Sequence, residues 1–292
     1  MTGLPLIKQG KVRDVYDAGA GRLVLDSTDR ISAFDIVLAD TIPRKGEILN
    51  AISACHLKMA DNSGIPTHYI SMVPAKRTAM FVYRLDMIPV EVIVRARLYG
   101  SAWQRYREGS FALPNGTEPR KGAQFPQPMV EFTTKLEASD RPVTRDEILR
   151  NGWMTADEIS YVIGTALDVH RLVSVNAAKG KIIVADQKFE FGRNPELAGV
   201  PVLGDEAGTP DSSRFWDEEL YAENYAAGRD QPSFDKQYVR DFLLRERGWD
   251  KERPKAGTRL TEPILTPEVV SQTTERYMEA RRRIMASAGD SK

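Results

Sequence analysis

The sequence of 292 residues predicts an α+β fold with two lobes. Short apolar segments rich in β-forming residues dominate residues 1–86, with one helix among them. Helical patterns dominate residues 230–292 instead. Strands that come first and helices that gather at the end are typical of α+β proteins. We therefore expect a β-rich N-terminal lobe at residues 1–86 and a larger α+β lobe at residues 87–292, which includes the C-terminal helices.

The N-terminal lobe is predicted to place two strands around a helix. Residues 22–26 and 79–83 are short, apolar and rich in β-formers, as strands are. Between them, residues 47–62 carry apolar side chains three and four positions apart, which predicts a helix. Gly64 follows as the expected helix stop.

The larger lobe is predicted to begin with a strand at residues 89–98 and a loop at the Gly- and Pro-rich residues 109–130. Two helices follow, each opened by the residues of a capping box, Thr144 with Glu147 and Thr155 with Glu158. The second helix carries a long apolar stripe and ends near Gly180. A strand at residues 182–192 then forms a hairpin with residues 200–205. Thr266 and Pro267 open the last helix as an N-cap and a first-turn proline.

Composition narrows the class of protein. The chain has 41 basic and 41 acidic residues, whereas proteins that bind nucleic acid or anionic membranes in general usually carry a basic excess. Cys55 is the only cysteine and only three histidines are present, so we expect any metal site to use carboxylates and a hard ion such as Mg²⁺ or Mn²⁺. The sequence contains neither a signal peptide nor a membrane span, and we expect a cytoplasmic protein.

The strand at residues 182–192 is the most informative segment. Alternate residues of a strand share a face. Strict alternation places one set of side chains on each face: Ile182, Val184, Asp186, Lys188 and Glu190 on one, and Ile183, Ala185, Gln187, Phe189 and Phe191 on the other. Charges such as Asp186, Lys188 and Glu190 are costly to bury unless water, a metal ion or a charged ligand contacts them. The pattern indicates the floor of a binding site, and a solvated edge strand with salt bridges is the alternative.

The predicted hairpin brings a second carboxylate to this face. Asp205 ends the partner strand, so it can approach Glu190 across the hairpin. Two carboxylates on neighbouring strands suit a Mg²⁺ ion that bridges nucleotide phosphates. Lys188 on the same face can neutralise transferred charge.

Two further segments are candidate anion sites. Residues 10–17 alternate cations with apolar residues after a glycine, which could cover phosphates, although a solvated amphipathic strand is the favoured alternative. Arg95 shares a strand face with Arg97, and the Gly100–Ser101 turn follows with amide groups and a hydroxyl that can bind an oxyanion. Arginine suits forked recognition of phosphate or carboxylate. Since more arginines follow, a merely basic surface is an equal alternative here.

Five segments, in this order, resemble the motifs of phosphoribosylaminoimidazole-succinocarboxamide synthase, the SAICAR synthetase family. They are Gly-Lys-x-Arg-Asp-x-Tyr at residues 10–16, Asp-Arg-Ile-Ser-Ala-Phe-Asp at 29–35, Pro-Val-Glu-x-x-x-Arg to Gly-Ser at 89–101, Val-Ala-Asp-Gln-Lys-Phe-Glu-Phe-Gly at 184–192, and Leu-Gly-Asp-Glu with Pro-Asp-Ser-Ser-Arg at 203–214. The resemblance covers nearly the whole chain. It implies a two-lobed, kinase-like and ATP-grasp-like architecture with antiparallel sheets and C-terminal helices.

The resemblance implies an ATP-dependent ligase of purine biosynthesis. Such an enzyme joins L-aspartate to the carboxylate of carboxyaminoimidazole ribonucleotide, with Mg²⁺ as cofactor, and we expect an acyl phosphate intermediate. Its partners are these small molecules, with neither nucleic acid nor membrane, and the expected assembly is a monomer or a small homo-oligomer.

The resemblance also implies a role for each motif residue. Lys11 and Arg13 are expected over the ATP phosphates, with Tyr83 and Leu85 at the adenine hinge. The expected metal ligands are Glu190 and Asp205. Arg95, Ser101, Asp211 and Arg214 are expected to bind the ribonucleotide. Asp186 and Lys188 are expected near the reacting carboxylate, and Lys135 in a loop that closes over the phosphates or the aspartate. One departure from the family pattern is Tyr99, where Thr or Ala is usual, and its ring could reshape the phosphate turn.

Two other functions fit the same residues. A small-molecule kinase similar to the inositol polyphosphate kinases also uses Asp-x-Lys, but it needs no nucleotide phosphate site like the segment from Arg95 to Ser101. A nucleotide-binding module without catalysis is the second alternative. Four intact residues argue against it: Lys11, Lys188, Glu190 and Asp205.

Overall fold

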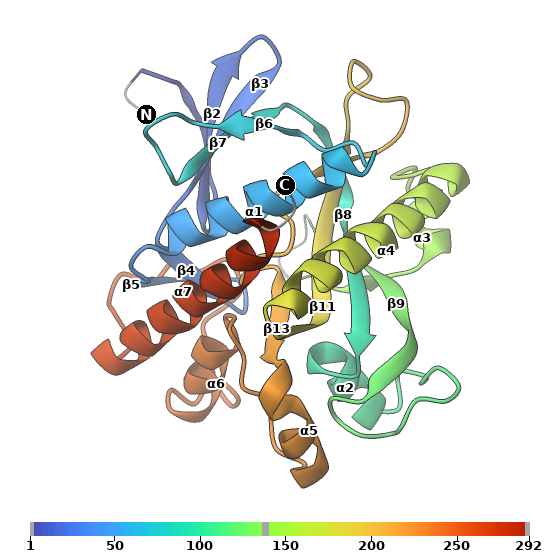
Figure 1. Cartoon of the computed structure of the whole chain (residues 1–292), viewed down its shortest axis with the longest axis vertical. Coiled ribbons are helices and arrows are strands. Elements are labelled where there is room, and N and C mark those ends of the chain that lie inside the picture. The colour runs from blue at the N-terminus through green and yellow to red at the C-terminus, as the bar shows by residue number, and fades with distance from the viewer. Residues whose placement is uncertain (1–2, 136–139, 290–292) are drawn as a thin grey trace.

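The computed structural model describes residues 3–135 and 140–289. A five-stranded antiparallel sheet forms the N-terminal part, in the order β1-β2-β3-β7-β6 (Figure 1). Its strands are β1 (Leu6–Gln9), β2 (Arg13–Gly19), β3 (Arg22–Ser27), β6 (Tyr69–Met72) and β7 (Ala79–Tyr83). The strands predicted at residues 22–26 and 79–83 are the central pair of this sheet, and helix α1 (Lys45–Asn62) lies where a helix was predicted.

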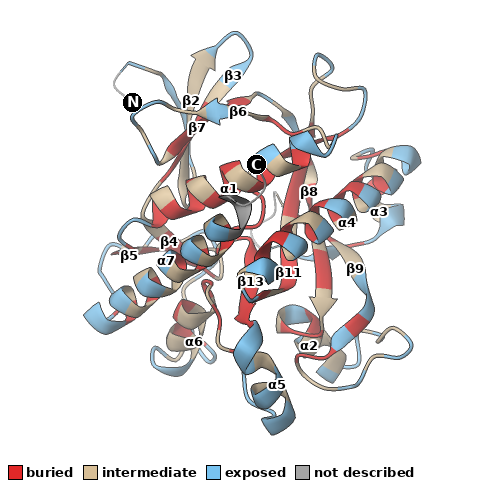
Figure 2. Cartoon of the chain, in the orientation of Figure 1, coloured by how far each residue is buried: buried red, intermediate tan, exposed pale blue. Residues whose placement is uncertain are grey.

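A second, six-stranded antiparallel sheet carries the middle of the chain, in the order β10-β9-β8-β11-β12, with β13 also paired to β11. Its strands are β8 (Asp86–Arg97), β9 (Gln124–Thr134), β10 (Pro142–Val143), β11 (Ile182–Arg193), β12 (Val202–Gly204) and β13 (Ser213–Asp217). The predicted hairpin is confirmed, because β11 and β12 pair with Glu190 opposite Gly204. Figure 2 shows that β8, β11 and β13 are mostly buried, whereas helix α5 (Glu218–Ala227) is exposed.

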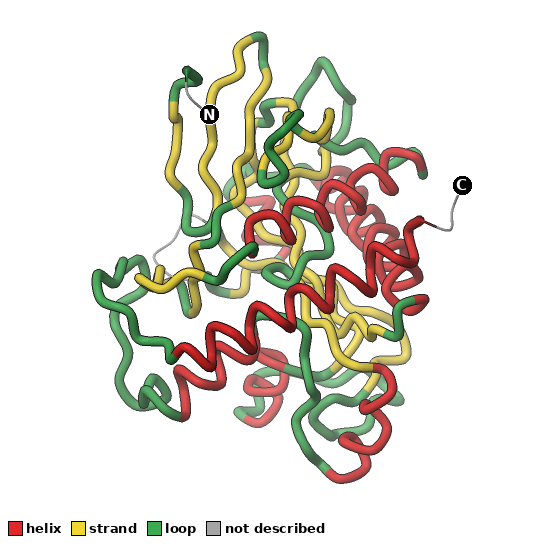
Figure 3. The backbone as a smooth tube through the Cα atoms, turned by 60° about the vertical axis from the view of Figure 1, so that its left-hand side comes forward, coloured by secondary structure: helices red, strands yellow, loops and turns green. Residues whose placement is uncertain are grey.

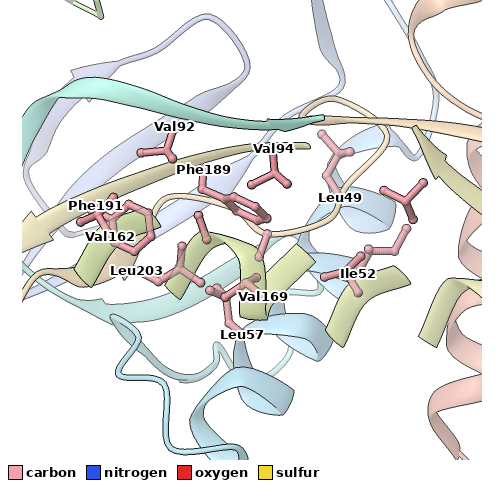
Figure 4. Close-up of a cluster of buried hydrophobic side chains, with 14 of the residues drawn as sticks. Leu49, Ile52, Leu57, Val92, Val94, Val162, Val169, Phe189, Phe191 and Leu203 are labelled. Carbon is pink, nitrogen blue, oxygen red and sulfur yellow. The ribbon is translucent and has the colours of Figure 1, made fainter. Parts of the chain in front are cut away.

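Helix α4 (Ala156–Lys179) lies along β8, β9 and β11 of the second sheet, and α1 packs on α4 and on β3, β6 and β7 of the first sheet. Helix α7 (Pro267–Gly289) packs on α1 and α4, α3 (Arg145–Arg150) precedes α4, and α2 (Gly100–Arg107) lies beyond the end of β8. Figure 4 shows Val92 and Val94 of β8 and Phe189 of β11 packed against side chains of α1 and α4. The predicted caps are present, since Thr144 accepts a hydrogen bond from the Glu147 amide and Thr155 forms a complete capping box with Glu158. This packing leaves the opposite face of the sheet free for polar side chains.

The C-terminal segment folds back onto a separate hairpin. Strands β4 (Arg30–Ala33) and β5 (Ile36–Thr41) pair, and their apolar side chains share a small core with α6 (Gln237–Arg245) and the start of α7. Phe34 and Asp35 join the two strands with φ of 53° and 62°, the left-handed backbone that two-residue hairpin turns need. In Figure 3, the strands of the first sheet extend away from the long helices. The C-terminal helices predicted within residues 230–292 are therefore confirmed as α6 and α7.

Two predictions about local structure are wrong. The loop predicted at residues 109–130 is shorter than expected, because β9 starts at Gln124. Pro126 and Pro128 made this part of β9 look like a loop in the sequence. Both prolines lie where β10 does not pair with β9, an edge position that tolerates proline. Strict alternation along β11 is also wrong, since a β-bulge lies between Val184 and Asp186. The bulge puts Ile182 and Val184 in the main core with Phe189, while Asp186, Lys188 and Glu190 keep a common face.

The division at residue 86 stays a prediction. The chain does pass from the first sheet to the second between β7 and β8. One hydrophobic cluster nevertheless contains Val82 of the first sheet and Val90 of the second. Among the described residues, no helix is long and apolar enough to cross a membrane.

Two buried histidines predict how stability depends on pH. The fully buried His56 ring donates from Nδ1 to the Ala207 carbonyl and accepts at Nε2 from Asn176, so a second ring proton would meet another donor. Burial lowers the pKa of His56 from 6.5 to about 4. As pH falls, His56 binds a proton in the unfolded chain at a higher pH than in the folded protein. The free energy of unfolding should therefore decrease as pH drops from 6.5 toward 4, by about 3 kcal/mol for this ring.

Urea unfolding at several pH values between 7.5 and 5 checks this expectation. We expect His56→Gln to be less stable at pH 7.5 but to lose less stability on acidification than the parent. His68, whose pKa burial also lowers to about 4, stays in place in both proteins. An equal pH slope in the two proteins would show that His56 does not carry the effect.

Candidate active site

The face of the second sheet that points away from the helices carries a band of charged side chains. Strand pairing sets Asp186 opposite Arg95 and Glu190 opposite Glu91, with Lys188 between them. Asp186, Glu190 and Arg95 are at most 6% exposed. Buried charges persist when they are paired, and each of these has an oppositely charged neighbour. The predicted common face of Asp186, Lys188 and Glu190 is therefore confirmed, and its role as the floor of a binding site stays a prediction.

Lys188 lies at the centre of the floor. Its ammonium group forms a short ion pair with Glu91 and lies 3.5 Å from Glu190 Oε1. Burial alone would lower the pKa of Lys188, but Glu91 and Asp205 raise it above its ordinary value. Lys188 is therefore a fixed cation at pH 7, which suits charge neutralisation rather than proton transfer.

Lys135 reaches the same floor from the end of β9. Its ammonium group forms an ion pair with Glu190, next to Lys188. Burial and the nearby Lys188 lower the pKa of Lys135, against the opposing effect of Asp205. Residues 136–139, the rest of the loop predicted to close over the site, lie outside the described residues.

Asp205 is held in an unusual backbone conformation just after β12. Its φ is 56°, which is uncommon for a residue with a side chain. The His68 ring donates from Nε2 to the Asp205 carbonyl at 3.1 Å, and Arg13 contacts the carboxylate at 3.0 Å. Burial would raise the pKa of Asp205, but Arg13, Lys135 and Lys188 lower it. Asp205 is thus an anion fixed next to Gly204, the residue that pairs with Glu190.

Glu190 and Asp205 suit a hard divalent cation. Magnesium is often bound by one or two protein carboxylates that are completed by water and substrate phosphates. Within the part of the chain that the structure describes, no group of three or more metal-ligating side chains is present, so phosphates would have to supply the remaining ligands. Three cations contact these carboxylates, namely Lys135, Lys188 and Arg13. Bound phosphates would attract the same three side chains.

A second cluster occupies the far end of the floor and suits a phosphate group. Arg95 donates to Ser101 Oγ at 2.9 Å and contacts Asp186, which Arg214 also contacts at 2.5 Å. Among the described residues, no side chain caps the start of helix α2 at Gly100, so its first amide groups can bind an anion beside these arginines. Gly100 has φ of 57°, and a Cβ there would lie 2.5 Å from the Arg214 guanidinium. The glycine therefore permits Arg214 to lie against the start of the helix.

Tyr99 supports this cluster. The ring packs edge-on against Trp216 with centroids 5.0 Å apart, and the Arg214 guanidinium lies 5.7 Å from its centroid. The hydroxyl donates to Asp230 at 3.2 Å. The bulky ring thus forms a buried wall behind Arg214.

The predicted nucleotide residues are spread along the first sheet, with Arg13 opposite Ser27 at one end of β3 and Tyr83 opposite Arg22 at the other. Lys11 follows the turn after β1 and pairs with Asp35 at 2.5 Å, with its side chain 50% exposed. Tyr83 ends β7, and Leu85 lies in the link to β8. A Cβ at Gly192 would lie 2.7 Å from Leu85 Cβ, so this glycine lets the link pass close to β11.

Asp211 lies deeper than the other predicted ligands. Its carboxylate accepts a hydrogen bond from the Tyr277 hydroxyl at 2.6 Å and contacts Lys45 at 2.9 Å. The side chain is only 3% exposed. Direct contact between Asp211 and the ribonucleotide stays a prediction.

Sequence reasoning missed several residues of the site. Glu91 is part of the Pro-Val-Glu-x-x-x-Arg motif, four residues before Arg95, and strand alternation would have placed both on one face. Glu131 lies in β9, directly after the segment predicted as a loop, and it forms ion pairs with Arg95 and Arg105. His68 carries no local signal, because its contact with Asp205 spans 137 residues of sequence.

Comparison with known proteins assigns the chain to a family. A profile described as SAICAR synthetase matches residues 6–256. A phosphoribosylaminoimidazole-succinocarboxamide synthase of Halorhodospira halophila is 40% identical over 295 residues, which cover 96% of this chain and 94% of that protein. The chain belongs to the SAICAR synthetase family. SAICAR synthetases are ATP-dependent ligases of purine biosynthesis, so the predicted family, fold class and enzyme class are confirmed.

Solved SAICAR synthetases share the fold. The SAICAR synthase of Saccharomyces cerevisiae, solved in complex with SAICAR, is 29% identical with a TM-score of 0.79, and the match covers 98% of this chain and 96% of that chain. A SAICAR synthetase solved in complex with ADP is 26% identical with a TM-score of 0.72, covering 96% of this chain and 97% of that chain.

Proposed function

We propose that this SAICAR synthetase joins L-aspartate to the carboxylate of carboxyaminoimidazole ribonucleotide, using ATP and Mg²⁺. The observation that carries the proposal is the continuous charged floor, with a two-carboxylate end at Glu190 and Asp205 and a phosphate-like end at Arg95, Ser101 and Arg214. The first end suits a metal–nucleotide complex and the second suits the phosphate of a ribonucleotide. Between them, Asp186 and Lys188 lie where the reacting carboxylate would be.

The chemistry requires activation of a carboxylate. A carboxylate does not react with an amine at neutral pH, because its resonance and charge disfavour attack. In the proposed first step, a carboxylate oxygen bonds to the γ-phosphorus of ATP and the bond to ADP breaks. The aspartate amine then attacks the acyl carbon, inorganic phosphate leaves, and the ammonium proton is lost. Phosphoryl transfer depends mainly on positioning and charge stabilisation.

The protein residues have distinct tasks in this scheme. Magnesium bound by Glu190 and Asp205 would neutralise phosphate charge. Lys188, held by Glu91, stabilises the negative charge that develops on the transferred group. Lys11 and Arg13 are proposed to bind the ATP phosphates, with Tyr83 and Leu85 beside the adenine.

An omission assay tests the function. ADP formation is followed with ATP, Mg²⁺, L-aspartate and carboxyaminoimidazole ribonucleotide, and then with each component left out in turn. We expect ADP formation to require all four components. ADP release that continues at full rate without aspartate would indicate a small-molecule kinase. In that case Arg95, Ser101 and Arg214 would form only an anion site.

A further inference from the structure

Residues 257–265, between α6 and α7, run along β5 and are called the strap below. The Val37 amide of β5 donates to the Thr258 carbonyl at 2.9 Å, and the Val37 carbonyl accepts from the Leu260 amide at 2.8 Å. This pattern pairs Val37 with Arg259 as in neighbouring parallel strands. The strap therefore adds a short extended stretch to the β4–β5 hairpin.

Apolar packing and a buried carboxylate fix the strap in this position. Leu260 and Ile264 pack against the small core that β4, β5 and α6 share. Asp40 is 7% exposed, and its carboxylate accepts hydrogen bonds from the Ile264 and Leu265 amides at 2.9 Å and 3.2 Å. Neighbouring side chains of an extended segment point to opposite sides, so Arg259 is directed away from the core that Leu260 contacts.

Arg259 reaches the connection between β1 and β2. Its guanidinium donates to the Gly10 carbonyl at 3.0 Å, across 249 residues of sequence. The Arg30 guanidinium donates to the same carbonyl at 3.2 Å and is itself held by Asp14 at 2.6 Å. The Gly10 carbonyl thus accepts hydrogen bonds from two cations that come from distant parts of the chain.

These two arginines orient one peptide group of the connection. The Gly10 amide donates to the Arg13 carbonyl at 2.7 Å, and a Cβ at Gly10 would lie 2.6 Å from that carbonyl oxygen, so the backbone has little freedom here. The Gly10–Lys11 peptide is trans, and the C=O and N–H groups of a trans peptide point in opposite directions. Because Arg30 and Arg259 hold the carbonyl, the Lys11 amide points to the other side of the connection. Within residues 3–135 and 140–289, this amide donates no hydrogen bond.

The orientation suits an anion on the side that faces away from the strap. A backbone amide that is already fixed in direction can stabilise negative charge without reorganisation. The side chain of Lys11 adds a cation that is 50% exposed and pairs with Asp35 at 2.5 Å. Arg13, at the end of the connection, contacts Asp205 at 3.0 Å, so the connection lies beside the proposed metal end of the floor. The phosphates of a nucleotide match this combination of amide, cations and metal site.

We propose that Arg259 is a positioning residue for the nucleotide. It holds the Gly10 carbonyl and so directs the Lys11 amide toward the phosphates of ATP. The inference rests on the proposed function, in which Lys11 and Arg13 bind these phosphates, and it adds a residue from outside the five motif segments. Arg259 acts through the backbone of the connection and not by contact with the nucleotide.

Steady-state kinetics of Arg259→Met and Arg259→Lys test the proposal. Methionine keeps an apolar stem without a donor, whereas lysine keeps the positive charge. The net loss of one hydrogen bond predicts that the KM for ATP rises about 3- to 10-fold in Arg259→Met, and less in Arg259→Lys. The KM values for L-aspartate and for the ribonucleotide should stay within about twofold. Lys255→Met removes an exposed cation just before the strap and is the matched control, which should behave like the parent.

Titration with ADP and with adenosine separates an effect on the phosphates from a general effect on the lobe. ADP binding to Arg259→Met should weaken in parallel with the KM for ATP. Adenosine, which lacks phosphates, should bind the parent and the variant with affinities that agree within about twofold.

Two outcomes would overturn the proposal. An unchanged KM for ATP in Arg259→Met would show that the orientation of the connection does not depend on Arg259. Equal weakening of ADP and adenosine would give Arg259 a purely structural role. Failure of the proposed function is a separate result: the parent enzyme would then form ADP without aspartate, and the effect of Arg259 on ATP could still be measured in that reaction.

Discussion

We expect Glu190→Gln to lower kcat about 10²- to 10³-fold, the usual effect of losing one preorganised electrostatic group. Glutamine keeps the shape of the side chain and removes its charge. Glu190 is 4% exposed and its carboxylate lies beside both Lys135 and Lys188, so the substitution removes a buried negative charge from the centre of the floor. The loss should be accompanied by weaker binding of ADP in the presence of Mg²⁺ but not in its absence.

Isothermal titration of ADP with and without Mg²⁺ checks the second part of this expectation. Glu223→Gln on α5 is a suitable control, because that side chain is 74% exposed and pairs with a surface arginine, Arg229. Undiminished turnover in Glu190→Gln would remove Glu190 from the proposed metal site.

The second large effect is expected at Arg95. The side chain is 4% exposed and binds Ser101, Asp186 and Glu131 at once. Replacing Arg95 with alanine leaves buried carboxylates with one cation each, and the cost of breaking such pairs is about 3–5 kcal/mol. We expect Arg95→Ala to be less stable and to raise the KM for the ribonucleotide about 100-fold, as expected for a lost phosphate contact of 2–3 kcal/mol.

Comparing nucleotide with nucleoside separates these two effects. The parent should strongly prefer the substrate with a 5′-phosphate over the nucleoside that lacks it, and Arg95→Ala should lose most of that preference. Ser101→Ala, which removes only one hydroxyl, should give a smaller change of the same kind without the loss of stability. If the preference for the phosphate survives in Arg95→Ala, the ribonucleotide phosphate binds elsewhere.

Local signals in the sequence predicted the parts of the fold that depend on neighbouring residues. The helix caps at Thr144 and Thr155, the hairpin of β11 with β12 and the shared face of Asp186, Lys188 and Glu190 all follow from short spacings. The bulge after Val184 was not predictable in this way, because it depends on how β13 pairs with β11. The start of β9 was also not predicted, because two prolines within it are typical of a loop, and the place of Glu131 in the sheet was missed for the same reason.

The supporting contacts of the site depend on residues far apart in sequence. Lys45 at the start of α1 meets Asp211 and Lys236 in the interior, and no local pattern connects them. Asp205 has a positive φ, and its carbonyl accepts a hydrogen bond from His68. An aspartate at that position in the sequence predicts neither feature. Family resemblance supplied roles for the motif residues, whereas the contact of the start of α6 with the Pro210–Phe215 segment emerged only from the structure.

Isotope transfer from the ribonucleotide carboxylate tests the central claim, that the charged floor activates this carboxylate by phosphoryl transfer. Carboxyaminoimidazole ribonucleotide labelled with ¹⁸O in both carboxylate oxygens is converted with ATP, Mg²⁺ and L-aspartate, and the inorganic phosphate is examined by mass spectrometry. The acyl phosphate route predicts one labelled oxygen in each phosphate released, with the other retained in the amide carbonyl. Unlabelled phosphate from a complete reaction would contradict it.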